Sequence, residues 1–322
     1  MEKRMLGATN LKVSPYCLGT MTFGAQADEA ESRSMVDLCL ERGINFIDTA
    51  NAYNAGTSKE ILGRVLAGRR DRVVLASKVF NKMGEGADDR GLSRAAISKA
   101  IDASLRRLKT DYLDLYYLHQ PDYAVPLEES LGVMDELVRA GKVRFVGASN
   151  YASWQVAAML WLAESNGWQP VAVVQPMYNL LARGIEQEFL PMCKNYGLAL
   201  VPYNPLAGGL LTGKHTGAAP IPDTRFERMP IYKDRYWHRA NFEAVQELTK
   251  IVKATGRSLT RLALGWLLHN PAVTSVIIGA SRTEQLRENL DALDDQPLPA
   301  ETLAACDEVW KNLRGITPQY NR

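Results

Sequence analysis

Four polar residues in the first half of the chain carry side chains that could together reduce a carbonyl group: Asp48, Tyr53, Lys78 and His119. A carbonyl that accepts a hydride develops negative charge on its oxygen and needs a proton donor. Tyr53 could be that donor, but a phenol with a pKa of about 10 is a weak acid unless a neighbouring ammonium, here Lys78, stabilises its anion. Asp48 would hold the ammonium in place, and His119 would orient the substrate oxygen.

Each of these residues also has a structural interpretation. His119 could be a hydrogen-bonded core residue, and Asp48 could cap a helix that starts at the next residue. Lys78 could be half of a buried ion pair, and Tyr53 could be a rim aromatic. A second chemical interpretation makes Lys78 a Schiff-base lysine, as in a barrel aldolase, with Asp48 and Tyr53 moving protons. Carbonyl reduction explains all four residues at once, so we favour it.

The elements that must position these residues alternate along the whole chain. Helical patterns, such as the apolar spacing of Ile97, Ile101, Leu105 and Leu108, separate short runs rich in β-branched and aromatic residues. These runs predict eight strands, at Tyr16–Gly19, Asn45–Asp48, Val73–Ser77, Leu113–Leu118, Val143–Ala148, Val173–Gln175, Leu198–Tyr203 and Ser275–Ile278. Eight successive strand–helix units favour closure over an open doubly wound sheet.

We therefore predict an α/β protein with a single (β/α)8 TIM barrel domain over residues 1–322, preceded by an N-terminal β-hairpin. One long interruption, Leu206–Ala240, follows the seventh strand and is rich in Gly, Pro and charge. It is too short to build a core of its own, so we expect it to be a lid on the barrel and not a second domain.

The active site of such a barrel lies where the strands end and the following loops begin. Tyr53 stands in the loop after the second strand, and polar residues stand at the ends of most of the others. These are Asp48, Lys78, His119, Ser149, Asn150, Gln175, Tyr203, Ser281 and Arg282. All of them would face one mouth.

Composition limits the kinds of partner that we expect this chain to bind. The 322 residues include 38 basic and 36 acidic ones, a net charge of +2, so no strong field attracts nucleic acid. The four cysteines, Cys17, Cys39, Cys193 and Cys306, have no spacing typical of a zinc site or a disulfide framework. No run approaches the ~18 apolar residues of a membrane span, and the N-terminus has no leader-like apolar region. We expect a cytoplasmic location, a small-molecule partner, and no metal, membrane or nucleic acid.

Several motifs in order along the chain resemble the aldo-keto reductase superfamily. They are Gly19-Thr20-Met21, the segment 43–53 ending in Asp48 and Tyr53, the segment 114–119 ending in His119, 141–150 ending in Ser149-Asn150, Gln175-Pro176 with Tyr178-Asn179, Tyr203-Asn204-Pro205-Leu206, and Gly279-Ala280-Ser281 with Gln285, Glu288 and Asn289. The stretch 203–214 is most similar to the bacterial branch that also resembles potassium-channel β subunits. Channel-associated members usually carry Asn where this chain has His119, which favours a working reductase.

The resemblance implies an NADPH-dependent reduction of an aldehyde or ketone, with Asp48, Tyr53, Lys78 and His119 as the catalytic tetrad. It implies a nicotinamide site at Ser149, Asn150, Gln175 and Tyr203. The remaining cofactor contacts that it implies are Gly19, Thr20, Met21, Asp48, Asn204, Pro205, Leu206, Ala207, Gly208, Lys214, Gly279, Ser281, Arg282, Gln285, Glu288 and Asn289. The arginine usual near the lid tip corresponds to Arg225 or Arg235, and we count Arg225 among the expected cofactor contacts. The resemblance leaves a homo-oligomer open.

Arg282 supports the choice of NADPH. It stands where the eighth helix begins, and a helix start with unoccupied amides beside a guanidinium favours a 2′-phosphate. Two other interpretations stay open. The segment Gly208–Lys214 nearly forms a phosphate-binding P-loop but has His215 in the Ser/Thr position. The chain could also be a redox-sensing subunit that binds NADPH with little turnover. The aromatic residues Phe23, Phe80, Tyr123 and Trp237 could line an apolar substrate pocket or pack the lid.

Overall fold

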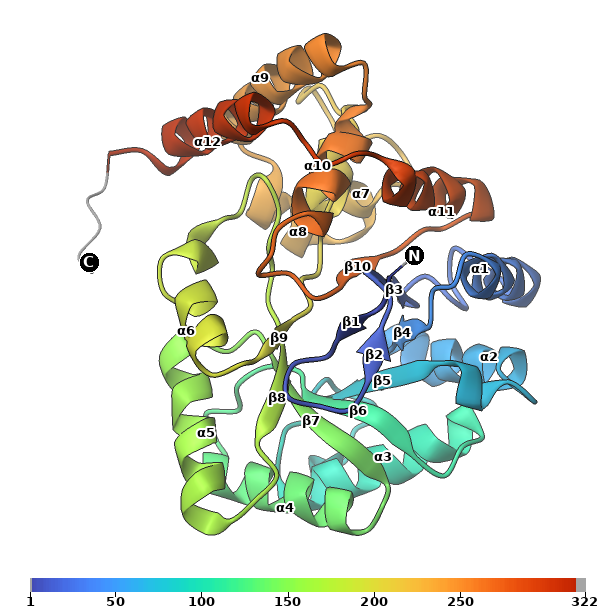
Figure 1. Ribbon diagram of the computed structural model, residues 1–322. Helices are drawn as coiled ribbons and strands as arrows, with labels where there is room; N and C mark the ends of the chain where they lie inside the picture. Colours follow the sequence, from blue (N-terminus) through green and yellow to red (C-terminus); the bar gives the residue numbers. More distant parts are fainter. Residues whose placement is uncertain (1, 317–322) are drawn as a thin grey trace.

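The computed structural model describes residues 2–316 and contains a curled sheet of eight parallel strands (Figure 1). Neighbouring strands follow in the order β10-β3-β4-β5-β6-β7-β8-β9, and backbone hydrogen bonds from Thr274 to Leu200 (2.8 Å) and from Ile277 to Pro202 (3.0 Å) join the two ends. The strands are β3 Tyr16–Gly19, β4 Phe46–Asp48, β5 Val74–Val79, β6 Leu113–Leu118, β7 Val143–Ser149, β8 Val171–Gln175, β9 Ala199–Leu200 and β10 Val276–Ile278. The predicted barrel is confirmed.

The predicted seventh strand, Leu198–Tyr203, is shorter in the structure, where β9 ends at Leu200. The chain stays extended beyond it, because Val201 and Tyr203 still donate backbone hydrogen bonds to Val174 and Pro176. On the β8 side, Pro176 has no N–H group to donate to the Val201 oxygen, so the regular ladder between β8 and β9 stops there.

Helices pack around the sheet between the strands. Serine and aspartate residues start several of them, because their side chains accept the first unpaired backbone amides: Asp28 accepts from Glu31 (2.8 Å) and Ser93 from Ala96 (3.2 Å). The helices are α1 Glu29–Glu41, α2 Thr57–Val65, α3 Arg94–Leu108, α4 Leu127–Arg139, α5 Ser153–Asn166, α6 Phe189–Asn195, α9 Arg239–Thr255, α10 Leu259–Leu268, α11 Thr283–Leu290 and α12 Ala300–Arg314. No helix within residues 2–316 has the length and apolar character needed to cross a membrane.

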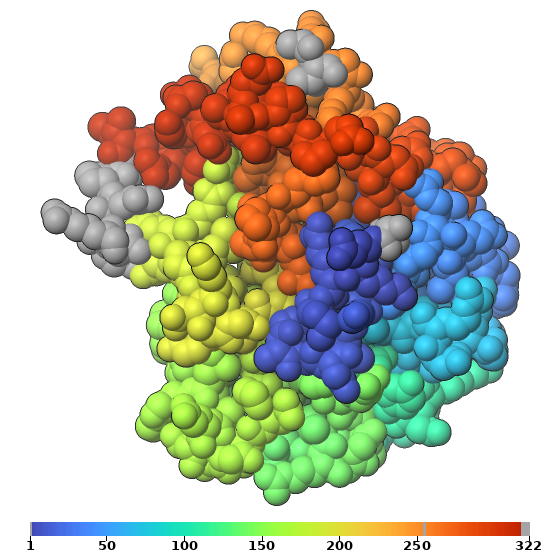
Figure 2. All heavy atoms as spheres, in the orientation of Figure 1, coloured from blue at the N-terminus to red at the C-terminus, as the bar shows by residue number. Residues whose placement is uncertain are grey.

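The predicted N-terminal hairpin, β1 Arg4–Met5 and β2 Lys12–Val13, closes the barrel at the amino ends of its strands. Figure 2 shows these first residues, in dark blue, lying across the face of the molecule between light blue, green, yellow and orange segments. Gly7 has φ +59°, and a Cβ there would come within 2.8 Å of the Ala172 oxygen and the Ala199 nitrogen. Only glycine fits this approach without strain. Leu6 and Leu11 of the hairpin join the apolar cluster inside the barrel.

The long connection after β9 folds into a 3-10 helix, Ala207–Thr212, and two short helices, α7 Arg225–Arg228 and α8 Pro230–Tyr236. Four rings hold it together, which we call the aromatic box: His215, Phe226, Trp237 and Phe242, with centroids 4.9–5.4 Å apart in edge-to-face pairs. The box lies against the outer core, so the segment is a packed lid and has no separate core.

Candidate active site

Asp48, Tyr53 and Lys78 meet at the carboxyl ends of the strands. Asp48 is the last residue of β4, Lys78 lies one residue before the end of β5, and Tyr53 begins a 3-10 helix, Tyr53–Gly56. The Lys78 Nζ forms an ion pair with Asp48 and donates to the Tyr53 hydroxyl oxygen at 3.2 Å and to the Thr49 carbonyl oxygen at 3.1 Å. Asp48 and Lys78 are both about 1% exposed. The ammonium is thus held between a carboxylate and a phenol.

The loop that carries Tyr53 is held in place by a residue that the sequence did not single out. Asn54 has a left-handed backbone (φ 49°), which asparagine tolerates better than most residues. Its side-chain amide donates to the carbonyl oxygens of Met21 (2.9 Å) and Phe23 (2.7 Å) in the loop after β3. Asn54 therefore fixes the two loops to each other, and its place directly after Tyr53 was the available signal.

Burial and charge act on these groups in opposite directions. Burial raises the pKa of Tyr53, Lys78 lowers it, Asp48 raises it again, and the net shift is upward. Burial alone would lower the pKa of Lys78, but Asp48 and Tyr53 raise it and the net shift is upward. The expectation that the ammonium makes Tyr53 more acidic holds for the pair alone and not for the whole site, because burial outweighs the attraction. At neutral pH the site holds a protonated phenol and an ammonium.

His119 follows β6 and is kept neutral. Burial, with the positive charges of Lys78 and Lys59, lowers the pKa of His119 to about 3. The Asn81 side-chain nitrogen lies 3.3 Å from the His119 Nδ1. An amide nitrogen only donates, so Nδ1 accepts and the ring proton stands on Nε2. Asn81 is a second supporting residue that the sequence analysis missed, since nothing about a loop asparagine after β5 marks it as the partner of a ring after β6.

The next residues around the mouth form one hydrogen-bonded chain. The Gln175 Nε2 donates to Asp48 at 3.0 Å, and the Ser149 hydroxyl donates to the Gln175 carbonyl oxygen at 2.8 Å. The Asn150 amide donates to the Ser149 oxygen (3.0 Å) and to the His119 carbonyl oxygen (2.8 Å). The Tyr203 hydroxyl donates to the Asn150 oxygen at 2.6 Å. The structure thus brings together the four residues that the sequence assigns to the nicotinamide, next to Asp48.

The lid lies over the ends of β3 and β10. A Cβ at Gly279 would lie 3.9 Å from both the Arg225 Nη2 and the Gly19 carbonyl oxygen, an ordinary van der Waals distance, so this arginine reaches the ends of β3 and β10. Arg225 stacks its guanidinium over the Tyr232 ring at 5.2 Å and makes no ion pair within residues 2–316. Burial raises the pKa of Tyr203 overall, but the positive charge of Arg235 lowers it, so Arg235 also lies near the mouth.

The strip Asn204 to Lys214 runs along the lid. The Asn204 oxygen accepts from Tyr232 at 3.3 Å, whereas the buried Asn204 Nδ2 has no partner among the described residues. Gly208 (φ +70°) lies under the Tyr232 ring, where a Cβ would approach to 2.7 Å, so this glycine is needed for lid packing. Thr20 is buried and donates to the Asp48 carbonyl oxygen, which ties the first loop to β4. Pro205, Leu206 and Ala207 complete the strip, and Lys214 is exposed.

The start of α11 differs from the sequence-based expectation. The backbone N–H of Thr283, expected to be unoccupied, donates to the Glu31 carboxylate, as does the Thr283 hydroxyl at 2.6 Å. The Gln285 Oε1 accepts from the Ser281 N–H (3.1 Å) and hydroxyl (2.9 Å). Arg282 and Glu288 are exposed and Asn289 is buried. Glu31 lies 252 positions before Thr283, so no local pattern could have revealed this contact.

The candidate aromatic substrate residues are mostly used for packing. Phe23 is fully buried in the core, and Trp237 belongs to the aromatic box. Tyr123 is 87% exposed, and Phe80 packs half-buried against the core. The structure therefore favours lid and core packing over a shared apolar pocket for Phe23, Phe80 and Trp237, whereas Tyr123 is exposed.

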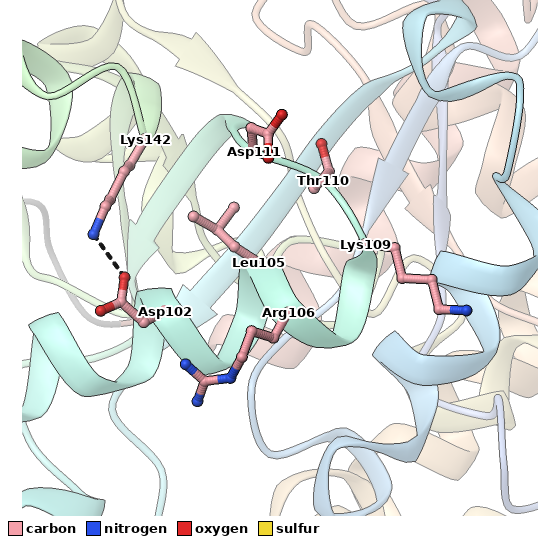
Figure 3. Close-up of a pocket in the computed structure, with 7 residues that line it drawn as sticks. All are labelled: Asp102, Leu105, Arg106, Lys109, Thr110, Asp111 and Lys142. Atoms are coloured by element: carbon pink, nitrogen blue, oxygen red, sulfur yellow. Dashed lines mark hydrogen bonds and ion pairs between the residues drawn. The ribbon is translucent and has the colours of Figure 1, made fainter.

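A separate hollow of about 460 Å³ lies at the opposite end of the barrel (Figure 3). It is lined by the last turns of α3, by Thr110 and Asp111 before β6, and by Lys142 before β7. Lys142 pairs with Asp102 across it at 2.7 Å. Because these residues precede their strands, the hollow lies at the amino ends, away from Tyr53 and Lys78. We place the candidate site at the carboxyl ends, where the buried ionisable groups converge.

The groups at the mouth fit a nicotinamide dinucleotide. Amide and hydroxyl groups next to Asp48 suit a carboxamide, the Tyr203 ring suits stacking, and the Asn204 amide and the Arg225 guanidinium are donors without an acceptor within residues 2–316. Gly279, just after β10, lies beside that guanidinium.

Comparison with known proteins shows which family this chain resembles over nearly its whole length. Residues 15–311 match the profile of the Aldo/keto reductase family. The chain is 37% identical to an uncharacterized oxidoreductase of Bacillus subtilis (strain 168), YrpG, over 99% of both chains. It is 37% identical to a probable voltage-gated potassium channel subunit beta of Arabidopsis thaliana, over 92% of this chain and 93% of that one. It is also 37% identical to aflatoxin B1 aldehyde reductase member 2 of Rattus norvegicus, over 95% and 87% respectively.

Proposed function

Because the chain belongs to the aldo/keto reductase family, we propose that it is an NADPH-dependent oxidoreductase that reduces an aldehyde or ketone to an alcohol. The observation that carries the proposal is the contact of the Lys78 ammonium with both Asp48 and the Tyr53 hydroxyl, in a buried site at the carboxyl ends of the strands. Residues 1–322 form one catalytic domain in this proposal, and its location is cytoplasmic.

The residues divide the reaction between them. When bound, NADPH supplies the hydride. Tyr53 donates its hydroxyl proton to the carbonyl oxygen as that oxygen gains charge, and the Lys78 ammonium stabilises the resulting phenolate. Asp48 keeps Lys78 charged in a site from which water is largely excluded. Neutral His119 donates a hydrogen bond from its Nε2–H group to the same substrate oxygen and orients it, without transferring the proton.

The cofactor would lie from Gln175 to α11. Ser149, Asn150 and Gln175 hold the carboxamide, Tyr203 stacks on the nicotinamide ring, and the Asn204 strip with Lys214 and Arg225 follows the pyrophosphate. The adenosine end lies at Gly279, Ser281, Arg282, Gln285, Glu288 and Asn289. Support comes from the Asn204 amide and the Arg225 guanidinium, neither of which has an acceptor in the described part of the chain.

Two alternatives differ in testable ways. A Schiff-base lysine needs a neutral amine, whereas Asp48 and Tyr53 raise the pKa of Lys78 and favour the ammonium. A redox-sensing subunit is favoured by the potassium channel β subunit among the relatives. Such a subunit would bind NADPH but oxidise it negligibly with any carbonyl.

The test is turnover with a panel of aldehydes and ketones, followed as loss of NADPH absorbance. We expect Tyr53→Phe to lower turnover at least about a hundredfold, the effect of removing a positioned acid, with little change in NADPH affinity. Tyr112→Phe, a half-buried tyrosine before β6 at the other end of the barrel, is the matched control. Wild-type-like turnover in Tyr53→Phe would remove Tyr53 as the proton donor. Tight NADPH binding without turnover on any carbonyl would favour the sensing subunit.

A further inference from the structure

Helices α1 and α11 pack side by side (Figure 1), and one carboxylate joins their first turns. Glu31, in the first turn of α1, accepts from both the backbone N–H and the hydroxyl of Thr283, the first residue of α11. Two residues before Thr283, the Ser281 N–H and hydroxyl groups both donate hydrogen bonds to the side-chain oxygen of Gln285. The backbone and hydroxyl donors of Ser281 and Thr283 are therefore already occupied by side chains of this chain.

The charges at this corner oppose each other. A helix start attracts an anion, and the anion present here is Glu31. Arg282, between Ser281 and Thr283, is exposed and makes no ion pair within residues 2–316. A 2′-phosphate arriving here would gain the Arg282 guanidinium but would have to displace the Glu31 carboxylate or stay beside it. A ribose 2′-hydroxyl carries no charge and can instead donate to that carboxylate.

We propose that Glu31 is a specificity-determining residue that weakens the preference of this chain for NADPH over NADH. The proposal rests on the proposed function, because it places the adenosine end of the dinucleotide at Ser281 to Asn289. Glu31 competes with the phosphate for Thr283, while Arg282 attracts it. The ratio of NADPH affinity to NADH affinity is therefore smaller than Arg282 alone would give, because the Glu31 carboxylate opposes the binding of the 2′-phosphate.

The test uses Glu31→Gln, which keeps an acceptor oxygen for Thr283 and removes only the charge. Glu29→Gln is the matched control, since Glu29 lies in the same turn but pairs with Arg64 at 2.9 Å. Binding is measured by calorimetry with NADPH, NADH, 2′,5′-ADP and 5′-AMP, so that the two fragments report the adenosine end without any turnover. We expect Glu31→Gln to bind NADPH and 2′,5′-ADP roughly two- to thirtyfold more tightly, the range for a charge at a helix end. Affinity for NADH and 5′-AMP should stay the same or fall, and the control should match wild type.

Arg282→Ala should do the opposite and weaken NADPH roughly ten- to 150-fold, with NADH almost unchanged. Unchanged NADPH affinity in Glu31→Gln would overturn the proposal. An equal gain for NADPH and NADH would overturn it too, because Glu31 would then act through the position of α11. Thermal melting checks that each variant is folded, and Glu31→Ser replaces Glu31→Gln if that variant is not. If the wild-type protein binds neither dinucleotide, the proposed function itself fails, which is a different result from a silent Glu31→Gln.

Discussion

Lys78 is the residue on which the chemistry of the site depends, since its ammonium contacts both Asp48 and Tyr53. We expect Lys78→Met to lower turnover about a hundredfold or more, because Tyr53 then loses the charge that stabilises its anion. That variant leaves Asp48 buried without its partner, which is itself destabilising. The double variant Asp48→Asn/Lys78→Met removes both charges and should be equally inactive while folding normally, as judged by thermal melting.

Borohydride treatment with substrate separates charge from covalency at Lys78. We expect no substrate adduct by mass spectrometry. A reduced Schiff base at Lys78 would instead assign the chain to a lysine-dependent chemistry.

His119 gives a prediction about pH. Its pKa is lowered to about 3, so the ring is already neutral well below neutral pH and stays so as pH rises. We therefore expect no titration of His119 in the profile of kcat/KM between about pH 5 and 9, although an ordinary histidine titrates near pH 6.5. Profiles of wild type and His119→Gln should differ in height and share one shape over this range. A wild-type acid limb close to pH 6.5 that disappears in His119→Gln would contradict the neutral assignment.

The lid depends on the aromatic box, and His215 is its one titratable ring. His215 is 4% exposed, and neither ring nitrogen has a hydrogen-bond partner among the described residues. Burial, and then Lys214, lower the pKa of His215. The open segment thus takes up a proton at about pH 6.5 and the packed segment only at lower pH, so acid favours opening and higher pH favours packing.

Amide hydrogen exchange of residues 215–236 at pH 7.5 and 5.5, corrected for intrinsic rates, measures this opening. We expect protection to fall at the lower pH in wild type and to fall less in His215→Phe, which keeps an aromatic ring without a titratable nitrogen. Equal acid-induced loss of protection in both proteins would show that another group controls the lid.

Among helices and strands, the sequence predicts those whose bounds depend on the local pattern of apolar and turn residues. Strands β3 and β6 have the predicted bounds, because apolar spacing and turn residues mark them directly. The seventh strand is shorter than predicted, since one proline interrupts its ladder. Lys78 and Tyr53 could be identified because each follows a predicted strand, where the active site of a barrel lies. Glu31 and Asn81 could not, because each acts on a loop or helix that only folding brings close.

The two ends of the barrel have different roles in this molecule: one carries the candidate active site, and the other carries packing and ion-pair contacts. At the carboxyl ends of the strands lie buried charges, left-handed loop residues such as Asn54 and Asn150, and the lid. At the amino ends the hairpin fills the barrel, and Arg70 and Arg144 both pair with Asp114. This division explains why the hollow in Figure 3, although roomy, is not where the reactive groups meet.

The hairpin also has a consequence for the order of events during synthesis. Arg4 donates to the carbonyl oxygens of Val273 (2.9 Å) and Leu268 (2.7 Å), so its partners are up to 269 positions later in the chain. At a ribosomal speed of about 5–20 residues per second, the first residues wait roughly 15–50 s before those partners exist. Leu6 and Leu11 have no finished barrel to fill during that time. The hairpin is therefore synthesised first but is among the last segments to reach its final position. In a nascent chain that is halted before β10, the hairpin has no completed barrel to pack against.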